Sequence, residues 1–104
     1  MRTLMKVTLP VGANSPSVKD GTIERLITET VTRIRPEASY FFPEHGHRTA
    51  IMVFDLKSPS DLPAITEPLF TELNASVELF PAMNAEDLKK GLATFLEQNA
   101  AVRR

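Results

Sequence analysis

The sequence predicts an α+β fold in a single domain, residues 1–104, with a four-stranded antiparallel sheet and three helices. Three observations lead to this prediction. In four segments apolar and polar residues alternate, in three others apolar residues recur every three or four positions, and a glycine-containing turn separates the second strand from the third. The resulting order, β-α-β-β-α-β-α, is typical of the ferredoxin-like fold with an extra C-terminal helix.

The first strand covers residues 5–11, where every second side chain is apolar. A helix follows and ends before Pro36. Its start is capped either by Ser17 with Asp20 or by Ser15 with Pro16 as first helical residue, whereas Gly21 weakens the first turn and favours a start near Thr22. Apolar residues at spacings of three and four form one stripe along this helix. They are Ile23, Leu26, Ile27, Val31 and Ile34.

The next two strands, residues 37–43 and 47–56, form a hairpin around residues 44–46. A three-residue hairpin loop commonly ends on a residue in the left-handed conformation, which Gly46 adopts without a steric clash. The sequence therefore predicts a three-residue loop at this position.

A second helix is expected over residues 60–73, with a kink at Pro68, and a fourth strand over residues 75–83. The last helix begins at Asn84, with Asp87 three residues later as its capping partner. Its apolar stripe is expected to be buried. The stripe consists of Leu88, Leu92, Phe95 and Leu96.

Composition and charge exclude several classes of function. The chain has 12 basic and 13 acidic residues and a net charge of −1, so it offers no basic surface for nucleic acid or anionic lipid. It contains no cysteine, which rules out disulfides and thiolate chemistry. The alternating N-terminus is unlike a signal peptide. We expect a cytoplasmic protein without a nucleic-acid or membrane partner.

Both alternating sets of the central hairpin are largely apolar, although helices cover only one face of a ferredoxin-like sheet. Monomers seldom leave a large apolar surface in water. We therefore expect the protein to form a homodimer through the face of the sheet that its helices leave open. The two sets are Tyr40, Phe42, Ala50, Met52 and Phe54 on one side, and Phe41, Ile51 and Val53 on the other.

With these elements placed, the chain resembles a family of small bacterial proteins of unknown function in the dimeric α+β barrel superfamily. The resemblance implies a ferredoxin-like protomer whose open sheet face meets that of a second copy to form a barrel. The matching segments are "LMKVTLPV" (4–11), "DGTI" (20–23), "PEASYF" (36–41), "GHRTAIMVFD" (46–55), "PAITEPLF" (63–70) and "NASVELFPAMNAEDL" (74–88).

The superfamily also contains cofactor-free monooxygenases of quinone biosynthesis, muconolactone isomerases and haem proteins. This chain departs from them in two respects. It has no tryptophan, which those monooxygenases typically use, and neither histidine lies on a predicted helix, where a haem ligand would be expected.

The two histidines, His45 and His47, flank the hairpin glycine, with Glu44 and Asp55 as further potential ligands. Two imidazoles and a carboxylate are suitable ligands for a divalent metal. However, one histidine falls in the turn and the other begins a strand, so their side chains need not converge. We expect a solvated hairpin tip and no metal site.

A stronger candidate site lies on the strands. The three-residue loop sets a register in which Tyr40 and Arg48 share a face, and Lys6 and Glu78 are the polar members of their own strands. We expect these residues to line a ligand site on the open face. The plain alternative is a surface ion pair between Lys6 and Glu78 with Arg48 at an edge.

The opposite assignment of the third strand is also consistent with its pattern. Met52 and Phe54 would then belong to the core, and Asp55 would lie near Lys6. The open face would carry Thr49, Ile51, Val53 and Asp55.

Two classes of function remain. The first is a homodimer that binds a small, partly apolar organic acid or phenol, with Arg48 as anion partner and Tyr40 as hydrogen-bond donor. The second is a cofactor-free isomerase or monooxygenase, with Tyr40 or Glu78 as acid or base. The chain has no Ser/His/Asp arrangement, nucleotide-binding loop or metal-spaced cluster. We therefore favour binding and expect no cofactor.

Overall fold

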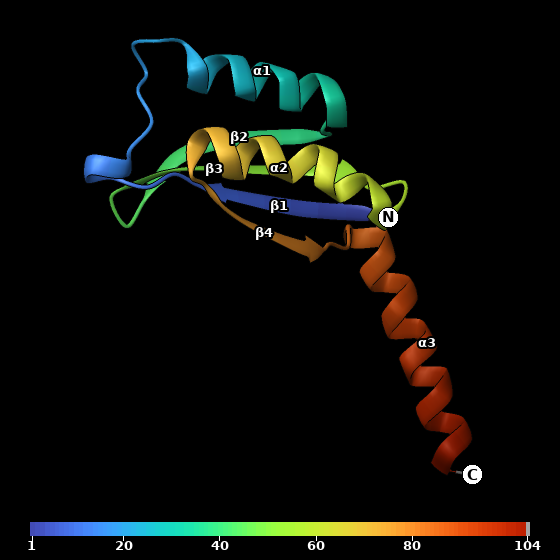
Figure 1. Ribbon diagram of the computed structural model, residues 1–104. Helices are drawn as coiled ribbons and strands as arrows, with labels where there is room; N and C mark the ends of the chain where they lie inside the picture. The colour runs from blue at the N-terminus through green and yellow to red at the C-terminus, as the bar shows by residue number, and fades with distance from the viewer. Residues whose placement is uncertain (104) are drawn as a thin grey trace.

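The computed structural model describes residues 1–103 and has a ferredoxin-like fold, as the sequence predicts (Figure 1). Its sheet is antiparallel throughout, with the strand order β2-β3-β1-β4. Short 3₁₀ turns occupy Gly12–Asn14 and Pro59–Asp61. The main elements are β1 (Arg2–Thr8), α1 (Thr22–Ile34), β2 (Ala38–Glu44), β3 (His47–Asp55), α2 (Leu62–Leu73), β4 (Ser76–Pro81) and α3 (Ala85–Arg103).

Helices α1 and α2 lie over one face of the sheet, whereas α3 projects away from the sheet and from both other helices (Figure 1). The core lies between the covered face and the two helices, and Met5 at its centre is fully buried. We call the other side of the sheet the open face. The principal core residues are Met5, Val7, Leu26, Ile34, Met52, Phe54, Ile65, Leu69 and Leu73.

The β2–β3 turn corrects one prediction. Glu44 and His47 are register partners, so only His45 and Gly46 form the loop. Their φ angles of 52° and 77° are both left-handed. This is a two-residue turn of the kind whose twist matches that of the flanking strands. The predicted three-residue loop was wrong, and the difference of one residue moves every β3 side chain to the opposite face.

The corrected register settles the two assignments that the sequence left open. Met52 and Phe54 are buried in the core beside β1, and Arg48 shares their face. Ile51 and Val53 lie on the open face. The predicted face shared by Tyr40 and Arg48 was therefore wrong, and the alternative assignment of β3 is the correct one.

The start of α3 is as predicted, but its surroundings are not. The Asp87 backbone N–H donates to Asn84 Oδ1 at 2.8 Å, and the Asn84 N–H donates to Asp87 Oδ2 at 3.1 Å. This reciprocal pair closes the first turn of the helix. The apolar stripe of α3, however, lies in solvent rather than in the core.

The part of the chain that the structure describes contains no helix with the length and apolar character needed to cross a membrane.

Candidate functional site

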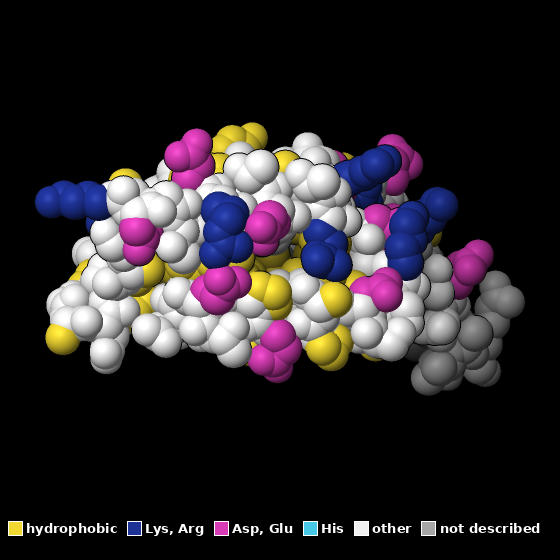
Figure 2. Space-filling view, turned by 45° about the horizontal axis from the view of Figure 1, so that its top comes forward, with side chains coloured by type: hydrophobic (Ala, Val, Ile, Leu, Met, Phe, Trp, Pro, Cys, Tyr) yellow, Lys and Arg dark blue, Asp and Glu magenta, His cyan; other side chains and the backbone are white. Residues whose placement is uncertain are grey.

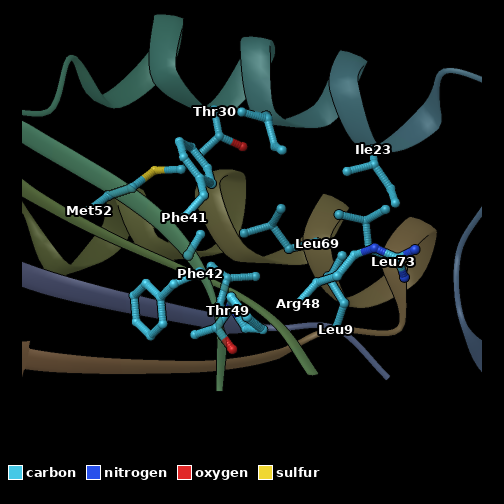
Figure 3. Close-up of a pocket in the computed structure, with 14 residues that line it drawn as sticks. Leu9, Ile23, Thr30, Phe41, Phe42, Arg48, Thr49, Met52, Leu69 and Leu73 are labelled. Atoms are coloured by element: carbon cyan, nitrogen blue, oxygen red, sulfur yellow. The ribbon is translucent and has the colours of Figure 1, made fainter. Parts of the chain in front are cut away.

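A cavity of about 440 Å³ lies between α1 and the β2–β3 hairpin, on the helix-covered face. Figure 2 looks onto the helix side, where hydrophobic side chains show along a furrow between charged ones. Figure 3 shows the lining side chains converging from α1, α2 and the strands. They include Val7, Leu9, Ile23, Ile27, Thr30, Phe41, Ala50, Met52, Leu69 and Leu73.

The cavity follows from a small side chain on β3. Ala50 pairs with Val7 of β1 on one side and with Phe41 of β2 on the other, so a single methyl group occupies the middle of this row. Protein interiors are normally filled to the density of organic crystals. Because α1 packs mainly against α2, the space above Ala50 is left open.

The lining is almost entirely apolar. The Thr30 hydroxyl is already satisfied, since it donates to the Leu26 carbonyl oxygen at 2.7 Å within α1. Arg48 supplies the charge at one end of the cavity, near Leu9 and Leu73 (Figure 3). Thr49 also lines the cavity, and its hydroxyl donates to the His47 carbonyl oxygen at 3.1 Å. A volume in this range and few polar groups, here with one charge, are typical of sites for small, partly apolar ligands.

The Arg48 guanidinium uses one of its N–H donors within the described residues. Its Nη1 donates to Ser15 Oγ at 3.1 Å, from the connection between β1 and α1. Within residues 1–103 no carboxylate lies within 4.0 Å of this guanidinium, whereas Arg2 and Arg25 each pair with two. A guanidinium carries five N–H donors in a fixed plane, which suits a carboxylate ligand.

The other three predicted site residues lie on the open face. Lys6 is opposite Glu78 on β4 and opposite Ile51 on β3. Tyr40 on β2 is opposite the other side of Ile51, two strands from Lys6. The structure therefore brings Lys6, Tyr40 and Glu78 to one face and places Arg48 on the other. The predicted site of four residues does not form within one chain.

The ion pair on the open face also differs from the expected one. The Lys6 ammonium pairs with the Glu44 carboxylate across β3 rather than with Glu78. The hydrogen bond with Glu44 raises the pKa of Lys6, and the same bond lowers the pKa of Glu44. Both side chains remain partly exposed, so the pair orders this face without making it strongly stabilising.

Asp55 does not approach Lys6 either, although the alternative assignment expected it to. It lies at the opposite end of β3, where it accepts hydrogen bonds from Lys57 Nζ at 2.5 Å and from the Met1 amino group at 2.6 Å. Together these cations lower its pKa to about 2.

The histidines stay at the hairpin tip. His45 occupies the left-handed turn, and His47 Nδ1 lies 3.0 Å from the His45 carbonyl oxygen. Among the described residues, no group of three histidine, aspartate or glutamate side chains gathers around a common point. The expectation that the pair binds no metal stays a prediction.

Comparison with known proteins shows a likeness in fold. No family model matches the chain, and no curated protein matches it either. Among solved structures, it is similar to a formyltetrahydrofolate deformylase from Pseudomonas putida KT2440, with a TM-score of 0.53 over 79% of this chain and 12% identity. The likeness lies in the fold. It spans 29% of the deformylase chain.

Sequence reasoning missed the cavity because it assigned Arg48 to the wrong face. A usable signal was present in "EHGHR", since a two-residue His-Gly turn was compatible with Gly46 in the left-handed conformation. That turn would have put Arg48 and Ala50 on the helix-covered face, an arginine beside a small residue among large apolar ones.

Proposed function

We propose that the protein binds a small, partly apolar organic acid or phenol in the cavity beneath α1, with Arg48 holding the anionic group. The single observation that supports this most strongly is an arginine without a carboxylate partner, among residues 1–103, at the end of an apolar cavity of about 440 Å³. Apolar walls favour the ligand's hydrocarbon part, and the guanidinium favours its charge.

The lining favours binding over catalysis. Of the described side chains that line the cavity, none is a histidine, carboxylate or tyrosine placed to transfer a proton. The isomerase or monooxygenase alternative relied on Tyr40 or Glu78, and both lie on the open face of the sheet. We therefore infer a carrier or sensor of the ligand rather than an enzyme that converts it.

We also propose that the protein is a homodimer assembled through the open face, as in a dimeric α+β barrel. Large side chains are exposed on this face, with Tyr40 64% and Phe80 45% accessible. Leu4 and Ile51 lie between them. Lys6, Tyr40 and Glu78 then belong to the contact between two copies, where the charged residues fix orientation more than affinity.

The ligand proposal is tested by a thermal-shift screen of aromatic and medium-chain carboxylates and phenols. A ligand at 100 times its dissociation constant should stabilise the wild type by ~2.7 kcal/mol. The Arg48→Ala variant should lose most of that stabilisation for the carboxylates. Arg33→Ala is the matched control, because Arg33 is an exposed arginine of α1 outside the cavity.

Equal stabilisation of wild type and Arg48→Ala would contradict the role of Arg48. A screen in which no compound stabilises the wild type at millimolar concentration would contradict the proposed function itself.

A further inference from the structure

Helix α3 carries an apolar stripe that no other described residue of the chain covers. Leu88, Leu92, Phe95 and Leu96 follow the three- and four-residue spacing of one helix face. Their exposed fractions are 47%, 53%, 57% and 65%. Helices in proteins owe most of their stability to packing of such an apolar face. We therefore expect another surface to pack against this stripe.

The direction in which α3 leaves the sheet is fixed at its base. Asp87, in its first turn, accepts a hydrogen bond from Arg2 Nη1 at 3.1 Å as well as closing the cap with Asn84. Arg2 also donates to Glu37, the residue before β2, at 2.5 Å. The first turn of α3 is thus hydrogen-bonded to β1 while the helix points away from the body of the fold (Figure 1).

We propose that α3 is an exchanged arm: its apolar stripe packs on the open sheet face of a second copy, which returns the same contact. This inference rests on the proposed homodimer and identifies α3 as the element that makes the contact between its two copies. One chain carries both a helix face without a sheet and a sheet face without a helix. Helix on sheet is a standard layer arrangement, and reciprocal exchange between two copies closes with twofold symmetry.

Size and charge fit this partner. A helix of 19 residues is about 28 Å long. A stable interface buries roughly 800 Å² per partner, and the reciprocal arrangement contributes two helix-on-sheet contacts toward that area. The side of α3 opposite the stripe carries Glu86, Lys90 and Glu97. Two acidic residues and one basic residue do not suit an anionic membrane, whereas they keep the outer side of the arm in water.

The absence of cysteine makes a clean test possible. Leu92→Cys protein is mixed with Phe80→Cys or Tyr40→Cys protein, refolded together and oxidised, and the disulfides are identified by mass spectrometry. Lys90→Cys, on the far side of α3, replaces Leu92→Cys in the matched control. All these positions are exposed or at the surface, so the fold should persist, which circular dichroism checks.

We expect a disulfide between unlike chains, formed on the order of tenfold faster from Leu92→Cys than from Lys90→Cys, because contact raises the effective concentration. A Leu92→Cys chain that links only to its own kind would replace the proposal with pairing of α3 to α3. If light scattering shows a dimer in which Tyr40→Cys chains link to each other but Leu92→Cys does not link, the exchanged arm is refuted and the homodimer is retained. A monomer by light scattering would refute both the arm and the homodimer.

In a second measurement, Leu92→Glu combined with Phe95→Glu should convert the dimer to monomer, while Glu97→Gln should leave it unchanged. A doubly substituted protein that remains a dimer would contradict the proposal that α3 holds the two copies together.

Discussion

At the scale of single residues, the assignment of Arg48 depends on one dihedral angle. His45 is left-handed at φ 52°, which shortens the loop by one residue and moves Arg48 from the open face to the cavity. Histidine adopts this conformation less readily than glycine, although it is one of the non-glycine residues enriched there. The sequence thus contained a strong signal for the left-handed conformation at the second turn position, Gly46, and a weaker one at the first, His45.

We predict that the stabilisation provided by Asp55 depends on pH. Its carboxylate is hydrogen-bonded first by Lys57 and then by the Met1 amino group, which lowers its pKa from 3.8 to about 2. A lowered pKa in the folded state means that the stabilisation is present above pH ~4 and is lost as the pH falls toward 2. The melting temperature of wild type should therefore approach that of Asp55→Asn over this range.

Thermal unfolding followed by circular dichroism between pH 2 and 6 measures this difference. The control is Asp61→Asn, which removes an exposed carboxylate that takes part in no ion pair among the described residues. Wild-type and Asp55→Asn curves that run parallel down to pH ~2 would show that these hydrogen bonds do not persist in solution.

At the scale of elements, periodicity in the sequence was enough to place all seven helices and strands in the correct order. It was not enough to state what each element packs against. The spacing of Leu88, Leu92 and Phe95 correctly indicated a helix with one apolar face, but the predicted burial of that face was wrong within one chain. A periodic pattern reports that a face needs covering, and it carries no information on which chain provides the cover.

Two glycines should respond oppositely to the same substitution. Gly46 has φ 77°, and a Cβ there meets no atom within 4 Å, so Gly46→Ala should destabilise by about 1–2 kcal/mol through backbone strain alone. Gly91 lies inside α3, also in open space, so Gly91→Ala should stabilise that helix by up to ~1 kcal/mol. Urea unfolding for the first, and helix content by circular dichroism for the second, check the signs. Two changes of the same sign would show that one of these backbone conformations is incorrect.

At the scale of the whole molecule, the fold was predictable and the site was not. The strand order and the single helical layer follow from the order of the elements. The cavity depends on how far α1 stands from β3, and that distance is set by the packing of α1 on α2 together with the small side chain of Ala50. No local pattern in the sequence encodes such a distance. Of the four residues predicted to bind a ligand, only Arg48 lines the cavity.

Under the proposed function an apolar acid binds beneath α1 and not on the open face. The most direct measurement is a methyl NMR titration of the wild type with a carboxylate found in the screen. We expect the resonances of Ala50, Ile27 and Met52 to shift together and saturate, while those of Leu4 and Ile51 on the open face stay in place. Saturating shifts of Leu4 and Ile51 with unchanged Ala50 and Met52 would place the ligand on the open face and contradict binding beneath α1.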